Sequence, residues 1–467
     1  MGGLFVKIVA SLGPSSTDEE LVLRMAEAGA DGFRTNFAHG DPEVWAYRLR
    51  AVRAAEEKLG KPLAMIGDLK GPSVRVGQMP EPLKLKRGGR VLVAPAVSSS
   101  TFPTVPVPYP SLFEAAEPGD EILIDDGRIR LQVVDRRGDA LECVSQVDGS
   151  VEAGKNVAIR GRDLDAPLID ERDEMALRFA ASEGFDFIGL SYVRDASDVE
   201  EVKRRLRQLG SDAWVISKVE TLSALRNLDS IVEASDAVLV ARGDLGIRLR
   251  LEEVPYYQKI VVEKCLEAGK PVIVATQFLA SMVESTTPTR AEVVDVNLAV
   301  SQGVDAIMLT NETSVGRNPL EAVKWLKRII DFTEEKMLAN GLERAVAKAR
   351  GAVRDADTRF AKGVLELAES MKARLVLYSA KGRMAAKVAA LRPSDAVFVG
   401  ASCRRAARKL ALLWGLHPFK VEAEDYDAGL KEALERCIRE GWVREGDTVI
   451  LGYGLRPPEQ KIIVKRL

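Results

Sequence analysis

The chain has 467 residues, with 67 Lys and Arg against 69 Asp and Glu, which gives a formal net charge of −2. Apolar residues make up 46% and charged residues 29%, a composition of globular and not of disordered proteins, and the length suits about three domains. The near-neutral charge argues against a nucleic-acid or anionic-membrane partner, and a total of two histidines, His39 and His417, argues against a Ser-His-Asp triad or a His-rich zinc site.

The four cysteines are scattered without C-x-x-C spacing, so we expect buried thiols and neither disulfides nor a thiolate metal site. The N-terminal segment lacks the basic stretch and long apolar stretch of an export signal, and no apolar run reaches about 18 residues. These features predict a cytoplasmic protein with no membrane segment.

Short apolar runs alternate with stretches of helical period over residues 1–71, which predicts parallel strands joined by helices. The runs are 6–12, 32–38 and 63–69. The pattern then changes, because residues 72–166 contain short strand-like segments separated by Gly and Pro. This change predicts a small β-rich domain inserted after the third strand.

The alternation resumes over residues 167–338 with five further apolar runs, FDFIGLSY, AWVISKV, DAVLVARG, PVIVAT and DAIMLT. Eight buried parallel strands with intervening helices are typical of a (β/α)8 TIM barrel. We therefore predict an α/β fold: a TIM barrel, an inserted small β-barrel domain that acts as a lid, and a C-terminal open-sheet α/β domain over residues 339–467.

Polar and charged side chains follow most of the predicted barrel strands, at the end where TIM barrels place their catalytic residues. Buried strands would not normally carry such groups, because an unpaired buried charge is costly. The residues are Arg34, Asn36, Asp68, Lys70, Ser191, Lys218, Glu220, Arg242, Asp244, Thr276, Asn311 and Glu312. Their recurrence at one end predicts an active site there.

Two segments are more specific. In SKVE, Lys218 and Glu220 lie two residues apart on a strand and therefore face the same side. In ARGD, a second carboxylate, Asp244, follows the next strand after Gly243, which allows close approach of a ligand. Two carboxylates without His or Cys suit Mg²⁺ or Mn²⁺, and a metal flanked by Lys and Arg suits phosphoryl transfer. A P-loop kinase is excluded, since no Gly-Lys pair precedes Ser or Thr.

The chain resembles the pyruvate kinase family over essentially its whole length. The resemblance is carried, in order, by VKIVASLGPSS, RTNFAHG, GDLKGPSVRVG, LIDDG, VISKVE, VARGDLGI, GKPVIVATQ and PTRAE. It implies a barrel domain, a β-rich lid and a C-terminal domain with a regulatory or oligomer-contact role. It also implies transfer of a phosphoryl group from phosphoenolpyruvate to ADP, which gives pyruvate and ATP in the last step of glycolysis.

The resemblance further implies residue roles. Lys218 neutralises the transferring phosphoryl group, Arg34 contacts it, and Thr276 contacts the substrate and assists protonation of the enol. The backbone amides of Gly243 and Asp244 bind the substrate carboxylate. Glu220 and Asp244 bind the divalent metal. The nucleotide-binding set is Asn36, His39, Arg75 and Lys155.

The K⁺ site of the family is only partly present in this sequence. Asn36, Asp68 and the carbonyl of Leu69 match it, but Ala38 replaces a serine, and Ser73 stands where cation-dependent members carry glutamate. We therefore expect weak or absent K⁺ dependence.

Arg248 also replaces a glutamate that the family pattern has after D-L-G-I. The charge around Asp244 is therefore expected to differ from that of typical members.

Two other hypotheses stay open at this point. A pyruvate-enolate barrel lyase or aldolase also pairs Glu and Asp on a metal, although the inserted domain, Lys218 and the C-terminal domain argue against it. A catalytically silent regulatory homologue would be consistent with the departures at Ala38, Ser73 and Arg248. The family implies a homotetramer with Arg290 and Glu292 near a subunit contact, and the sequence identifies no effector.

Overall fold

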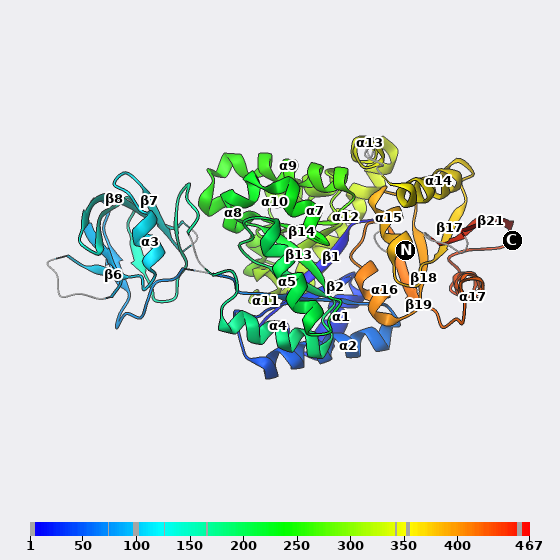
Figure 1. Ribbon diagram of the computed structural model, residues 1–467, viewed down its shortest axis with the longest axis horizontal. Coiled ribbons are helices and arrows are strands. Elements are labelled where there is room, and N and C mark those ends of the chain that lie inside the picture. Colours follow the sequence, from blue (N-terminus) through cyan, green and yellow to red (C-terminus); the bar gives the residue numbers. More distant parts are fainter. Residues whose placement is uncertain are drawn as a thin grey trace.

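The computed structural model describes residues 5–72, 74–96, 102–125, 127–164, 167–340, 343–351, 355–454 and 460–467, without the side chains of 338–340 and 343–344. Three parts lie in a row along the longest axis of the molecule (Figure 1). The inserted β-rich part is at one end, a barrel surrounded by helices is in the middle, and a C-terminal α/β part is at the other end.

The central part is a closed barrel of eight parallel strands in the order β1-β16-β15-β14-β13-β12-β3-β2. The predicted TIM barrel is therefore confirmed. Its strands are β1 (Lys7–Leu12), β2 (Gly32–Asn36), β3 (Ala64–Asp68), β12 (Phe187–Leu190), β13 (Trp214–Val219), β14 (Ala237–Ala241), β15 (Val272–Ala275) and β16 (Ala306–Leu309).

Helices cover the outside of the barrel, and acidic or hydroxyl residues begin several of them. Side chains of Asp18, Asp41, Asp170, Asp195 and Thr289 each accept a first-turn amide hydrogen, which satisfies a donor that the helix itself leaves free. The helices are α1 (Glu19–Glu27), α2 (Pro42–Leu59), α4 (Glu171–Glu183), α5 (Ala196–Gln208), α6 (Leu222–Arg226), α7 (Leu228–Ala234), α8 (Arg242–Arg248), α9 (Val254–Ala268), α10 (Arg290–Ser301), α11 (Asn311–Ser314) and α12 (Pro319–Asn340), with 3-10 turns at Leu251–Glu253 and Ala280–Val283.

The inside of the barrel is filled by apolar side chains from alternate strand positions, which include Ile66 and Ile216. Because side chains on a strand alternate between faces, the residues two positions further along, Asp68 and Lys218, also point inward. They lie at the carboxyl ends of β3 and β13. The polar site is thus the last inward-facing layer above an apolar interior.

The barrel closes between the first and the last of its strands. β1 pairs with β2 on one side, with Val9 opposite Gly32, and with β16 on the other, with Lys7 opposite Ala306. The chain leading into β1 is held by α12, because Glu334 Oε1 accepts hydrogen bonds from the amide of Val6 at 2.6 Å and from the preceding amide at 3.2 Å.

The inserted part, expected as a small β barrel, consists of a six-stranded sheet, β11-β7-β8-β9-β5-β6, and a two-stranded sheet, β10-β4. A separate cluster of buried apolar side chains forms its core. Its elements are β4 (Leu83–Leu85), β5 (Arg90–Ala94), β6 (Thr104–Pro106), α3 (Pro110–Ala115), β7 (Glu121–Ile124), β8 (Ile129–Arg137), β9 (Ala140–Ser145), β10 (Gly149–Val151) and β11 (Val157–Ile159).

The C-terminal part is an open five-stranded sheet, β19-β18-β17-β20-β21, parallel except for the antiparallel last strand. Its elements are α13 (Glu343–Gly351), α14 (Ala356–Ser370), β17 (Arg374–Tyr378), α15 (Arg383–Ala390), β18 (Val397–Ala401), α16 (Arg404–Leu410), β19 (Leu416–Lys420), α17 (Tyr426–Arg439), β20 (Thr448–Tyr453) and β21 (Lys461–Arg466).

A buried ion pair joins the C-terminal part to the amino-terminal end of the barrel strands. Arg392 Nη2 lies 2.6 Å from Asp305 Oδ2, and both side chains are 1% exposed. Trp414, whose amide donates to Asp305 Oδ1 at 3.0 Å, stacks on Phe5 with ring centroids 5.0 Å apart. The C-terminal part is therefore fixed at the end of the barrel opposite the polar strand ends.

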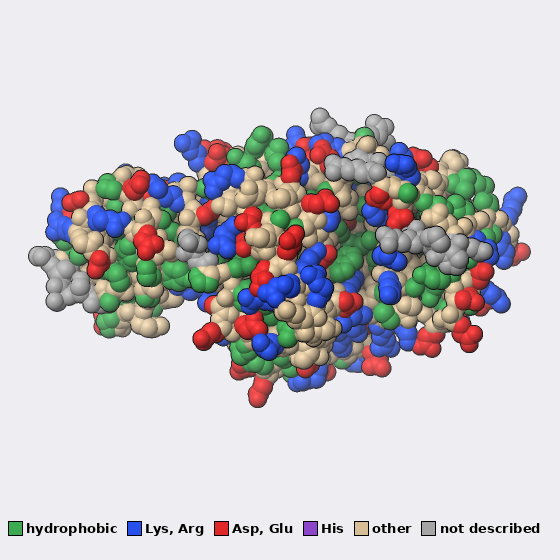
Figure 2. All heavy atoms as spheres, in the orientation of Figure 1, with side chains coloured by type: hydrophobic (Ala, Val, Ile, Leu, Met, Phe, Trp, Pro, Cys, Tyr) green, Lys and Arg blue, Asp and Glu red, His purple; other side chains and the backbone are tan. Residues whose placement is uncertain are grey.

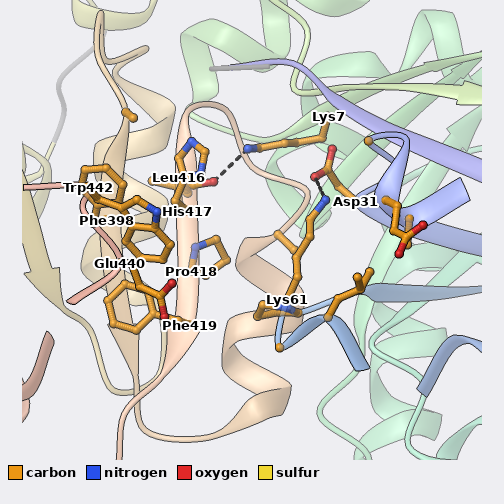
Figure 3. Close-up of a pocket in the computed structure, with 18 of the residues that line it drawn as sticks. Lys7, Asp31, Lys61, Phe398, Leu416, His417, Pro418, Phe419, Glu440 and Trp442 are labelled. Atoms are coloured by element: carbon orange, nitrogen blue, oxygen red, sulfur yellow. Dashed lines mark hydrogen bonds and ion pairs between the residues drawn. The ribbon is translucent and has the colours of Figure 1, made fainter. Parts of the chain in front are cut away.

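A cavity of about 690 Å³ lies between the amino-terminal strand ends and the C-terminal sheet (Figure 3). Lys7 enters from the barrel side and donates to the carbonyl of Leu416 at 2.8 Å, while Lys61 pairs with Asp31 at 2.8 Å. His417 enters from the opposite wall (Figure 3). The cavity is therefore at the far end of the barrel from the polar strand ends.

On the face shown in Figure 2, basic and acidic side chains are interspersed, in agreement with the near-zero net charge. Among the described residues, no helix is both long and apolar enough to cross a membrane.

Candidate active site

Lys218 is the centre of the polar cluster at the carboxyl ends of the barrel strands. Its ammonium lies 2.7 Å from Glu220 Oε1, 3.3 Å from Asp68 Oδ1 and 2.7 Å from Ser191 Oγ. Burial by itself lowers the pKa of Lys218, but the surrounding carboxylates outweigh burial and raise it. Lys218 therefore carries a fixed positive charge at the mouth of the barrel.

Asp68 joins the two cations of the site. It accepts hydrogen bonds from the guanidinium of Arg34, one of them from Nε at 3.0 Å, and it also pairs with Lys218. Burial alone would raise the pKa of Asp68, but Lys218 and Arg34 lower it below its ordinary value. The carboxylate thus stays charged and holds both cations side by side.

The two carboxylates predicted to bind a metal directly follow neighbouring strands, β13 and β14. Glu220 is 1% exposed, and Asp244 lies in the first turn of α8, which directly follows β14. Burial raises the pKa of Glu220, an effect that Lys218 opposes and Asp244 reinforces, so the two carboxylates are close enough to repel each other. A divalent cation would relieve this repulsion, and the all-oxygen donor set suits a hard cation.

Within the described part of the chain, no group of three or more His, Cys, Asp or Glu side chains is placed to hold a metal ion. A divalent cation bound by two carboxylates has further coordination positions, which substrate or water can fill. This donor set fits the predicted Mg²⁺ or Mn²⁺.

Thr276 and Gly243 lie side by side across β14 and β15. The Gly243 amide donates to Thr276 Oγ1 at 2.7 Å. Thr276 has a φ of +76°, an uncommon conformation for a β-branched residue that indicates local strain. Arg242 holds this turn: it donates to the Thr276 carbonyl, binds both oxygens of Asp295 at 2.7 Å and stacks on a phenylalanine ring.

The network contains contacts to which the sequence motifs assign no role. Ser191 accepts from Lys218 and donates to the Leu69 carbonyl at 2.8 Å, so its hydroxyl fixes the ammonium relative to β3. The next residue, Tyr192, has a φ of +58°, and its amide donates to Glu220 Oε2 at 2.9 Å. The polarity of Ser191 at a strand end was visible in the sequence, but nothing there linked it to Lys218.

The predicted nucleotide-binding residues come from both the barrel and the inserted part. Arg75 and Lys155 lie on two paired segments of the inserted part, where Arg75 forms a β-bridge to Asn156. Lys155 pairs with Asp125 at 3.0 Å, and Arg75 donates to the carbonyl of residue 154 at 2.8 Å. The inserted part therefore carries both cations on neighbouring antiparallel segments.

His39 and Asn36 lie at the rim of the barrel. His39 is exposed, and partial desolvation together with the positive charges of Arg75 and Arg34 lowers its pKa. Asn36 Oδ1 accepts from the amide of Ala38 at 2.9 Å and stabilises the local turn.

The residues matching the K⁺ site are already engaged with protein groups. Asp68 binds Arg34 and Lys218, the Leu69 carbonyl accepts from Ser191, and Asn36 accepts from a backbone amide. Ser73 lies outside the described residues.

Comparisons with known proteins match almost the whole chain. A family model described as "Pyruvate kinase, barrel domain" matches residues 5–323, and one described as "Pyruvate kinase, alpha/beta domain" matches residues 358–460. The pyruvate kinase of Aeropyrum pernix is 38% identical over 448 residues, which are 95% of each chain, and that of Pyrobaculum aerophilum is 37% identical over 464 residues, 98% of this chain and 96% of the other. The crystal structure of the Pyrobaculum aerophilum pyruvate kinase superposes with a TM-score of 0.87 and covers 99% of both chains at 36% sequence identity.

Proposed function

The chain belongs to the pyruvate kinase family of phosphotransferases, and from this premise we propose that it transfers the phosphoryl group of phosphoenolpyruvate to ADP, giving pyruvate and ATP. The observation that carries the proposal is the ammonium of Lys218, which is held between Asp68, Glu220 and Ser191 next to the guanidinium of Arg34. Phosphoryl transfer needs positive charge held in place around a migrating PO₃ group, because negative charge spreads over its oxygens in the transition state.

In this proposal, Lys218 and Arg34 stabilise the transferring phosphoryl group. Asp68 and Ser191 hold these cations so that little reorganisation is needed during the reaction. The amides of Gly243 and Asp244 bind the substrate carboxylate, for which the Gly243 amide must exchange its bond to Thr276. The Thr276 hydroxyl is then released beside the substrate, where it assists protonation of the enol.

Glu220 and Asp244 would hold a divalent metal, Mg²⁺ or Mn²⁺. When bound, this cation supplies charge stabilisation to the substrate oxygens and to the phosphoryl group. Tyr192 orients one ligand, because its backbone amide donates a hydrogen bond to Glu220 Oε2. Asp295 binds Arg242, which begins α8 two residues before the other ligand, Asp244.

We assign residues 1–71 and 167–338 to the catalytic barrel domain, 72–166 to a lid domain and 339–467 to the C-terminal domain. The lid presents Arg75 and Lys155 toward the phosphates of ADP, with Asn36 and His39 at the barrel rim. Its closure over the strand ends would exclude water from the transferring group. A cytoplasmic homotetramer with Arg290 and Glu292 near a subunit contact completes the assignment.

K⁺ dependence is expected to be weak or absent, because Ala38 and Ser73 stand where the K⁺ site of the family has a serine and a glutamate. Exchange of K⁺ for a tetraalkylammonium salt tests this. A tenfold or larger loss of turnover would contradict it.

Turnover of phosphoenolpyruvate, ADP and Mg²⁺, coupled to lactate dehydrogenase, tests the main assignment. Lys218→Met should lower kcat by about a thousandfold or more, with only a few-fold change in KM for phosphoenolpyruvate, because the charge is needed mostly in the transition state. Lys264→Met is the matched control, since Lys264 pairs with Asp229 at 2.9 Å on the outside of the barrel. An unchanged kcat for Lys218→Met would overturn the proposal.

A further inference from the structure

Arg248 ends helix α8, four residues after Asp244, at the position where the family pattern has glutamate. Its side chain is 11% exposed, so the guanidinium is largely buried. Its Nη1 donates to the backbone carbonyl of Asp244 at 3.3 Å, and its guanidinium carbon lies 5.2 Å from the ring centre of Tyr192. Arg248 therefore contacts the backbone of one proposed metal ligand and the residue whose amide holds the other.

The strand that returns from the inserted part rests on the same helix. The Gly161 amide donates to the Arg248 carbonyl at 3.2 Å. Ile247 packs against Leu123 and Ala158, which belong to two strands of the inserted sheet. The end of α8 therefore forms a contact between the barrel and the inserted part.

Asp163, on this returning segment, links it to the other carboxylate. Its two oxygens accept the amides of Leu222 and Ser223 at 3.1 and 2.7 Å, at the start of α6 and directly after Glu220 and its neighbour. Arg248 Nε lies 3.5 Å from Asp163 Oδ1. A glutamate at position 248 would instead face the negative charges of Asp163 and Asp244, so an arginine suits this chain.

We propose that Arg248 is a positioning residue that couples the seating of the inserted part to the geometry of the Glu220–Asp244 pair. This inference rests on the proposed function, in which the two carboxylates hold the divalent metal. The Arg248 guanidinium reaches the returning segment at Asp163, next to the backbone hydrogen bond between Gly161 and the Arg248 carbonyl. Displacement of that segment then changes the placement of both carboxylates together.

The test compares Arg248→Gln with Arg248→Lys in two measurements. Binding of Mn²⁺ alone is followed through the spin resonance signal of the free ion, and kcat and KM for ADP are followed in the coupled assay. For Arg248→Gln, we expect the Kd for Mn²⁺ and the KM for ADP each to rise fivefold or more, with a smaller change in kcat. Arg248→Lys keeps the charge and should recover most of the Mn²⁺ affinity.

Two further variants separate the coupling from a general charge effect. Arg226 lies 3.8 Å from Asp163 Oδ2, and 69% of its side chain is exposed to solvent. Arg226→Gln is therefore the matched control and should leave the Kd for Mn²⁺ and the KM for ADP unchanged. If Arg248 acts through Asp163, then Asp163→Asn should change the Kd for Mn²⁺ less in the Arg248→Gln background than in the wild type. Effects that multiply fully would contradict the coupling.

Hydrogen exchange gives a readout independent of turnover. In Arg248→Gln, the amides of 222–223 and 161 should exchange faster. Arg226→Gln should leave the amide of 161 unchanged, and this amide is the one compared between the two variants, because Arg226 also donates to Ser223 Oγ at 3.0 Å. Unchanged Mn²⁺ affinity and exchange in Arg248→Gln, equal effects in Arg226→Gln, or a lower melting temperature with unaltered constants would each overturn the inference. If Arg248→Gln does not fold, Arg248→Lys and Asp163→Asn carry the same comparison. An active wild type with unaffected variants refutes this inference alone, whereas an inactive wild type that still shows the Mn²⁺ and exchange effects refutes the proposed function and leaves the coupling standing.

Discussion

Replacement of Arg392 by methionine should destabilise the joint between the barrel and the C-terminal sheet. The guanidinium binds both oxygens of Asp305, at 2.6 and 3.2 Å, and donates to the carbonyl of Gly303 at 3.1 Å. Arg392 has a φ of +53°, but methionine keeps the same backbone conformation, so the change isolates the loss of the charge and its hydrogen bonds.

The magnitude follows from what Asp305 retains. Removal of one partner of a buried ion pair costs about 3–5 kcal/mol, because the other charge stays buried without compensation. The amides of Val272 and Trp414 still donate to Asp305, at 2.9 and 3.0 Å, and stabilise its charge. We therefore expect a loss near the lower limit, about 3 kcal/mol in the free energy of unfolding.

Urea denaturation, followed by tryptophan fluorescence and circular dichroism at one protein concentration, measures this loss. Arg374→Met is the control, since Arg374 pairs with Asp395 at 2.7 Å with side chains 37% and 51% exposed, and an exposed pair of this kind contributes about 0–1 kcal/mol. A loss below about 1 kcal/mol in Arg392→Met, or one equal to that of Arg374→Met, would refute the argument from burial.

Three more predictions test single features of the site and of the interface. Ser191→Ala removes a hydroxyl 2.7 Å from the Lys218 ammonium and should lower kcat about tenfold with an unchanged melting temperature, which kinetics and calorimetry together would show; an unchanged kcat would mean that the carboxylates alone position the lysine. A Cβ on Gly189 would lie 2.7 Å from Asp68 Oδ1, so Gly189→Ala should lower kcat/KM at least about tenfold while circular dichroism stays the same, and full activity would show that the carboxylate can shift freely. Burial and Lys7 lower the pKa of His417 to about 3, so below about pH 6.5 the unfolded chain binds a proton that the folded chain does not. The free energy of unfolding should therefore fall as the pH drops, by about 2 kcal/mol at pH 5. His417→Asn should remove this part of the fall, which urea titrations at pH 5 and 7 would measure.

The barrel could be predicted because its strands are continuous apolar runs. Each of the eight runs became a strand of the closed barrel, since a strand buried on both faces has to be apolar throughout. The inserted part was less accessible to this reasoning. Alternation predicts strands but not whether they close, and the described strands form a six-stranded and a two-stranded sheet.

The sequence predicted which residues form the site better than it predicted their contacts. Strand periodicity predicts that Lys218 and Glu220 face the same side, and the structure places them 2.7 Å apart, with Glu220 one residue beyond the end of β13. The pairing of Lys218 with Asp68 joins residues 150 positions apart, and no local pattern carries it. Nothing in the sequence indicated the positive φ of Tyr192, because a tyrosine ordinarily avoids that conformation.

Closure of the barrel between β1 and β16 has a consequence for synthesis of the protein. Residues 7–12 leave the ribosome about 300 residues before their partners at 306–309, so at about 5–20 residues per second one edge of the first strand waits roughly 15–60 s for its hydrogen bonds. The sheets at 83–159 draw all their strands from one contiguous stretch, so they are complete long before the barrel that carries them. The nascent chain therefore passes through a stage with a finished outer module and an open, adhesive strand edge, the kind of intermediate that chaperones protect from aggregation.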